Sequence, residues 1–128
     1  MFPSRLLVLA TAAFAVVPAA HAAAAESCTA RAGALFDALG HGDYQAASRL
    51  MDARLRAQSF PQPLPAMWEA LIKNNYGAYR GHGEGTATRN GDGTTTVSIP
   101  LEFERSSWTY RVTCDARQGG AIDEMLMQ

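Results

Sequence analysis

The sequence predicts an α+β domain in which three helices pack on one face of a four-stranded curved antiparallel sheet. Residues 94–114 contain two adjacent runs in which apolar and polar residues alternate, the period of a strand with one buried face. Three earlier stretches repeat apolar residues at helical spacing. Because the helical stretches come first and the strands follow, we expect the helices to cover one face of the sheet.

The two alternating runs predict a hairpin with a specified register. A four-residue loop at residues 104–107 sets Phe103 opposite Trp108 and Leu101 opposite Tyr110. The same register pairs Ile99 with Val112 and Val97 with Cys114, so that all eight side chains lie on one face. We therefore expect this whole apolar set to be buried against the helices.

The remaining elements follow from local signals. Helical spacing runs from Cys28 to Leu39 and stops at glycines, and Asp43 caps a second helix that reaches Leu55. Pro65 begins a third helix that ends within residues 74–77. Residues 79–89 form a first strand, residues 90–93 form a turn, and residues 121–127 form the last strand.

The N-terminus has the pattern of a secretory signal peptide over residues 1–22. A basic start at Arg5 precedes an apolar run over residues 6–17, and small residues follow Pro18. This predicts a periplasmic or secreted protein, with a flexible tail at residues 23–27 and one domain at residues 28–128. The apolar run is shorter than the ~20 residues that a membrane-spanning helix needs, so no span is expected in the mature chain.

Composition argues against several partners. Without Arg5 the chain carries ten basic and twelve acidic residues and no basic cluster, so nucleic acid is not an expected partner. Gly81, Gly83 and Gly85 alternate with polar residues and lack the spacing of a nucleotide-binding loop. No cofactor and no metal site are expected, because no third ligand accompanies His82 and Glu84 at a recognisable spacing.

The two cysteines predict a disulfide. An exported chain reaches an oxidising compartment, and Cys28 and Cys114 are the two cysteines present. Cys28 begins the first helix and Cys114 ends an inward-facing strand, so the bond would tie the N-terminal helix to the sheet.

Several of these motifs resemble a known family. Residues 35–36 with Gly42-Asp43-Tyr44, residues 67–71 with Tyr76-Gly77, and residues 108–113 are similar to the domain-of-unknown-function family 3887. The resemblance covers nearly the whole mature chain. It implies a small exported α+β domain similar to the cone-shaped, nuclear transport factor 2-like (cystatin-like) folds, often attached to an α/β-hydrolase domain. No catalytic residues are defined for the family, so none carry over.

The candidate binding residues are three aromatics and one polar pair. Trp68, Tyr76 and Tyr110 are able to stack on a ligand, although such residues are more often core. His82 and Glu84 share one strand face. A three-residue loop at 91–93 with Asn90 opposite Thr94 would turn the neighbouring glycines inward and His82 to water, and a two- or four-residue loop would reverse this.

These features favour a non-enzymatic exported domain that binds a small apolar ligand or a protein partner. The alternative is a small hydrolase-like or isomerase-like enzyme in which His82 acts as general base and Glu84 orients it inside a cone-shaped pocket. A third reading is a homodimer on the open sheet face, where Thr96, Ser98, Glu102, Thr109, Arg111 and Thr113 lie.

Overall fold

The computed structural model describes residues 19–128, with side chains from residue 23 onward, so residues 1–18 of the predicted signal peptide lie outside the described residues. The helices are α1 (Ala19–Gly40), α2 (Tyr44–Arg49), α3 (Ala53–Ser59), α4 (Leu64–Leu71) and a π-helical turn η1 (Ile72–Tyr76). The strands are β1 (Tyr79–His82), β2 (Thr86–Arg89), β3 (Thr94–Phe103), β4 (Ser107–Asp115) and β5 (Ala121–Met127). A short 3₁₀ helix η2 (Ala116–Gln118) joins the last two strands.

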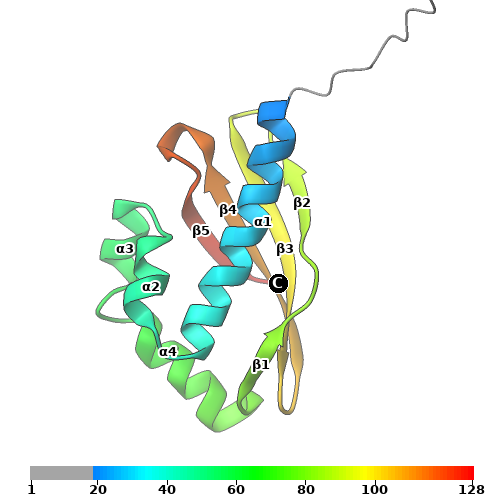
Figure 1. Ribbon diagram of the computed structural model, residues 1–128. Helices are drawn as coiled ribbons and strands as arrows, with labels where there is room; N and C mark the ends of the chain where they lie inside the picture. The colour runs from blue at the N-terminus through cyan, green and yellow to red at the C-terminus, as the bar shows by residue number, and fades with distance from the viewer. Residues whose placement is uncertain (1–18) are drawn as a thin grey trace, which may run out of the picture.

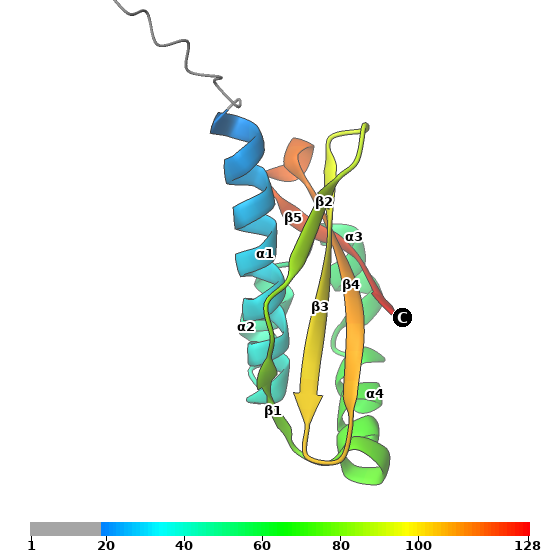
Figure 2. The ribbon, with the colours of Figure 1, turned by 90° about the vertical axis from the view of Figure 1, so that its right-hand side faces the viewer.

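The architecture is α+β, as predicted, with a curved and unclosed antiparallel sheet. The strand order is β1-β3-β4-β5, and β2 pairs with β3 in line with β1. Figure 1 shows α1 lying along one face of the sheet, with α2, α3 and α4 gathered beyond the β5 side. Figure 2 shows α1 on one side of the sheet, with α3 and α4 behind β4. The six polar residues of the predicted dimer surface alternate with the buried residues of β3 and β4, so they lie on the face of these strands that points away from the core.

The predicted second helix is two helices. Asp43 caps α2 as expected, by accepting a hydrogen bond from Ala46 N–H. The chain then leaves the helix because residues 50–52 pair with β5: Ile122 N–H donates to Leu50 O, and Asp52 N–H donates to Ile122 O. Asp52 starts α3 by accepting from Leu55 N–H at 2.7 Å. This tertiary contact explains why there are four α-helices rather than three.

Helix α1 also starts earlier than predicted. Residues 23–27, expected to form a flexible tail, belong to the same helix as residues 28–40. Ala is the strongest helix former, and Ala19, Ala20 and Ala22–Ala25 supply that propensity.

The β3–β4 hairpin keeps the predicted faces but not the predicted register. Leu101 pairs with Trp108, Ile99 with Tyr110 and Val97 with Val112, a shift of two residues. The loop shortens to Glu104 and Arg105. Its two N–H groups donate to Ala78 O and Tyr76 O, so the tight turn is stabilised by the segment that precedes β1.

The core lies between α1 and the inner face of the sheet. Seven of the eight side chains expected there from β3 and β4 are buried, namely Val97, Ile99, Leu101, Phe103, Tyr110, Val112 and Cys114. Trp108 is the exception: it pairs with Leu101 but stays 37% exposed. It packs on Tyr76 instead, with ring centroids 5.2 Å apart.

The predicted strand over residues 79–89 is interrupted. Residues 83–85 separate β1 from β2, and the register with β3 changes by one residue between them. The break explains the count of five strands rather than four.

The predicted disulfide is confirmed by the position of the two cysteines. Cys28 of α1 and Cys114 of β4 lie at disulfide distance, with Cα atoms 5.8 Å apart and 86 residues between them in sequence. Both are buried. Within residues 19–128, none of the helices combines the length and the apolar character that crossing a membrane requires.

Candidate functional site

The clearest apolar pocket lies between α4 and the inner face of β4 and β5. It has a volume of about 160 Å³ and is lined by Leu64, Met67, Trp68, Leu71, Tyr110, Met125 and Met127. Met67 and Met127 are 57% and 51% exposed. Two flexible methionines at the surface therefore border a hollow whose other walls are buried or partly buried, an arrangement that adapts readily to an apolar guest.

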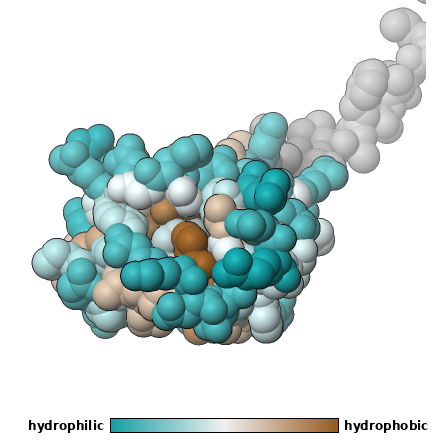
Figure 3. All heavy atoms as spheres, turned by 90° about the horizontal axis from the view of Figure 1, so that it is seen from below, coloured by the Kyte–Doolittle hydropathy of each residue, from teal (hydrophilic) through white to brown (hydrophobic). Residues whose placement is uncertain are grey.

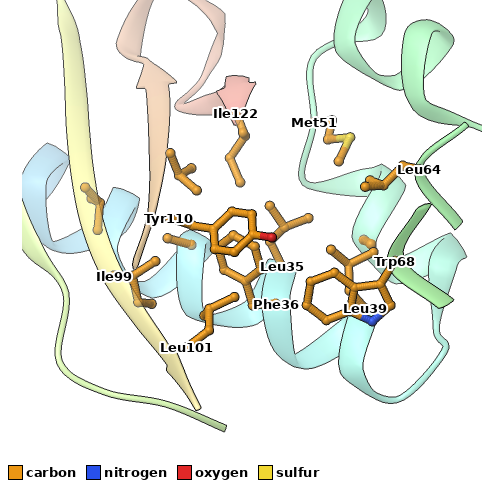
Figure 4. Packing of buried hydrophobic residues seen from close by; sticks show 14 of the residues in the cluster. Leu35, Phe36, Leu39, Met51, Leu64, Trp68, Ile99, Leu101, Tyr110 and Ile122 are labelled. Atoms are coloured by element: carbon orange, nitrogen blue, oxygen red, sulfur yellow. The ribbon is translucent and has the colours of Figure 1, made fainter. Parts of the chain in front are cut away.

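Tyr110 forms the wall on the strand side. Its ring packs against Phe36 of α1, with centroids 5.1 Å apart, and its hydroxyl points toward α4 in Figure 4. Burial and the neighbouring Tyr76 raise the pKa of Tyr110, so its hydroxyl stays protonated at neutral pH and can donate a hydrogen bond.

Trp68 forms the wall on the helix side and is 3% exposed. Its indole contacts Phe103 and Tyr79, with centroids 5.7 and 6.0 Å away. Within residues 19–128 the buried Nε1 has no hydrogen-bond partner. In Figure 4 this nitrogen lies on the edge of the indole that points away from Tyr110. Two of the predicted binding residues, Trp68 and Tyr110, thus share one pocket.

Tyr76 stands beside the pocket rather than in its lining. Its hydroxyl donates to Met127 Sδ at 3.6 Å, and its ring packs on Phe103 with centroids 5.1 Å apart. It therefore links the π-helical turn to the end of β5. π-Helical turns are frequent at functional sites.

The His82 side chain lies toward Asp37 and Gly33 of α1, and the residue is nevertheless exposed to solvent. Of the loop lengths considered, the three-residue form is present, with Asn90 N–H donating to Thr94 O. The one-residue register change at residues 83–85 then reverses the faces, so that His82 sits opposite the inward residue Leu101. A Cβ on Gly33 of α1 would lie 2.8 Å from the His82 ring, and only glycine leaves room for it.

The partner of His82 is Asp37 rather than Glu84. Nε2 of His82 lies 3.4 Å from Asp37 Oδ2, and the Tyr79 hydroxyl donates to Asp37 Oδ1 at 2.8 Å. Nδ1 of His82 lies 2.9 Å from Gly83 O. Glu84 is exposed and only borders the same hollow of about 400 Å³ between α1 and the strand break.

This geometry limits the chemistry open to His82. Each ring nitrogen faces an oxygen of the protein, so neither is left free to take a proton from a substrate in this conformation. The cluster joins β1 to α1 and has the character of a structural contact.

Another hollow lies at the C-terminal end of α1. It measures about 410 Å³ and is lined by Leu39, Gly40, His41, Gly42, Tyr44, Trp68, Glu69, Ile72 and Lys73. Figure 3 views the molecule from this end and shows a few hydrophobic residues in a hollow ringed by hydrophilic ones. Among the described residues, no three His, Cys, Asp or Glu side chains are grouped so as to hold a metal ion.

Sequence reasoning missed three residues that contribute to these sites. Met125 and Met127 alternate along β5, and their spacing already placed them on one face of a strand. Asp37 lies four residues after Gly33, so both share a face of α1. Neither signal reveals which element packs opposite.

The fold and the pocket define a small α+β domain with an apolar recess at one sheet edge. The family model described as "Protein of unknown function (DUF3887)" matches residues 32–118, and the chain belongs to this family. Comparison with curated proteins and with solved structures found no match.

Proposed function

We propose that this domain is a non-enzymatic binding module that accepts an apolar group in the pocket between α4 and β5. The observation that carries the proposal is the exposure of Met67 and Met127 at the mouth of a recess walled by Trp68 and Tyr110. Exposed apolar patches on soluble proteins commonly mark interaction sites, and ligand-binding sites are usually concave and apolar.

The volume of the pocket limits the size of the group that it can bind. Pockets for drug-sized ligands measure roughly 300–1,000 Å³, whereas this one measures about 160 Å³. A cavity of roughly 150 Å³ holds a molecule the size of benzene. The guest is therefore one apolar side chain of a protein partner or the end of a short alkyl ligand.

We place this module outside the cytoplasm. The Cys28–Cys114 disulfide is compatible with an extracellular or periplasmic protein, since disulfides persist in oxidising compartments. The signal-peptide pattern supports the same location.

Methionine methyl resonances test the proposal. In protein labelled at the methionine methyl groups, 1-hexanol is expected to shift the signals of Met67, Met125 and Met127. Met51 is buried outside the pocket and serves as the internal reference. Met67→Lys should abolish the shifts by placing a charge at the mouth, while Ala66→Lys, a neighbouring exposed position, should keep them. Unchanged pocket methionines at saturating hexanol would contradict the proposal.

The enzyme alternative rests on a single favourable point: His82 lines a hollow of about 400 Å³ between α1 and the strand break. Catalysis would require the ring to leave Asp37 and expose Nε2. An esterase screen of wild type and His82→Ala decides this. Turnover lost in His82→Ala, with an unchanged melting temperature, would replace the binding module by an enzyme.

A further inference from the structure

Strand β5 has an edge that is half covered and half open. Its first half is paired with residues 50–52 through both backbone groups of Ile122. The pairing with β4 then shifts at Asp123, since Cys114 pairs with Ile122 and Thr113 pairs with Glu124. This bulge resets which backbone groups point outward.

The open groups beyond the bulge belong to Met125 and Met127. Gln128 N–H donates to Thr109 O at the end of β4. This bond shows which residues of β5 use their backbone groups to pair with β4. In an antiparallel pair the residues alternate between bonding the neighbouring strand and pointing away from it. The N–H and C=O groups of Met125 and Met127 therefore face the free edge. Across residues 19–128, no backbone group pairs with them.

These two residues also line the apolar pocket with their side chains. A strand added to this edge would place its own alternate side chains on the same face, beside Met125 and Met127. Backbone pairing and filling of the pocket mouth are thus available to one extended segment at once.

The flank of the open edge is acidic. Asp123 and Glu124 directly precede it, and Asp52 and Asp115 lie near enough to act on Asp123. Burial, followed by these carboxylates, raises the pKa of Asp123, and Arg54 opposes them in part. A basic residue opposite Glu124 would complement this charge.

We infer that the free edge of β5 adds a strand from a protein partner, an extended segment with apolar residues at two alternate positions followed by Lys or Arg. Such strand addition takes affinity from main-chain hydrogen bonds and specificity from pockets for alternate side chains. The inference rests on the proposed apolar pocket and names the class of partner that fills it.

A synthetic peptide, Ac-Thr-Leu-Thr-Leu-Lys-Thr-NH₂, tests the inference. In antiparallel orientation its two leucines lie opposite Met127 and Met125 and its lysine opposite Glu124. The matched control is the same peptide with both leucine nitrogens methylated, which keeps the side chains and the charge and removes the donors. We expect the unmodified peptide to bind at least about tenfold more tightly and to protect the amides of Met125 and Met127 from hydrogen exchange.

A charge exchange provides the second arm. Glu124→Lys should weaken the lysine peptide and favour the version with glutamate in place of lysine. If the unmodified peptide and its N-methylated control bind wild type equally, and both shift the methyl signals of the pocket methionines as hexanol does, strand addition is overturned and the pocket proposal stands. Loss of both peptide binding and hexanol shifts would overturn both. If the protein self-associates without peptide, and only this self-association protects the amides of Met125 and Met127 from hydrogen exchange, the edge pairs with a second copy of the chain. That result would overturn the inference of a separate protein partner.

Discussion

The Tyr79 hydroxyl donates a 2.8 Å hydrogen bond to Asp37 Oδ1 and thereby joins β1 to α1. The same carboxylate faces the His82 ring through its other oxygen. Sequence alone gives no reason to connect Asp37 with either residue, because both lie more than 40 positions away. One half-exposed carboxylate therefore holds the N-terminal helix against the outermost strand.

Tyr79→Phe is expected to lower the free energy of unfolding by about 1 kcal/mol, because it removes a hydrogen bond to a charged group that is partly open to solvent. Urea denaturation at neutral pH measures the change. Tyr44→Phe is the control, since the Tyr44 hydroxyl donates to exposed Glu69 and should contribute less. Equal losses in the two variants would contradict a special role for the Asp37 contact.

Alkaline pH should destabilise the protein through its tyrosines. Burial, with the Asp37 carboxylate, raises the pKa of Tyr79 well above its usual value, and burial with Glu69 raises that of Tyr44 to about 12. A raised folded pKa leaves stability fully present below about pH 10, the unfolded value, and removes it as pH rises further. The loss attributable to Tyr79 approaches about 1.4 kcal/mol per pH unit. Urea unfolding at about pH 9 and about pH 11 should show a weaker pH dependence in Tyr79→Phe than in wild type.

Gly40→Ala should destabilise the fold by about 1–3 kcal/mol, because a Cβ there would overlap the Tyr79 ring. Gly91→Ala is the matched control, since nothing lies within 4 Å of a Cβ at that position. Thermal melts compare the two. A neutral Gly40→Ala would mean that the ring of Tyr79 moves freely away from α1.

Trp68→Ala is expected to cost about 3–5 kcal/mol, as for other large buried aromatics. Trp68→Phe should cost much less than its lost volume suggests, because it also removes a buried N–H that has no partner among residues 19–128. Chemical denaturation of both variants gives the two values. A Trp68→Phe loss as large as that of Trp68→Ala would indicate that Nε1 is hydrogen-bonded in solution.

Reduction of the Cys28–Cys114 bond should lower stability by about 4.6 kcal/mol, the chain-entropy value for a loop of this length. The double variant Cys28→Ala with Cys114→Ala should match the reduced protein. Differential scanning calorimetry with and without reductant tests this. An unchanged melting temperature after confirmed reduction would rule out the stabilising role.

The residues that alternate or recur at helical spacing determined much of the fold in advance. The inward set of β3 and β4 follows from period-two alternation, because a strand must turn every second side chain to the same face. The cap at Asp43, the last strand and the cysteine pairing also follow from local signals and from the chemistry of export.

Three features were decided only by tertiary structure. A shift of two residues in the β3–β4 register leaves every side chain on the same face, so the alternation of apolar residues cannot distinguish the four-residue loop from the two-residue loop. The carbonyls of Tyr76 and Ala78 select the two-residue loop by accepting hydrogen bonds from its N–H groups. The direction of His82 depends on a one-residue break at Gly83–Gly85, which reverses the faces that a three-residue loop would otherwise give. The pocket joins α4 to the far end of β5. Contacts between elements so distant in sequence depend on side-chain packing in three dimensions, which no local pattern encodes.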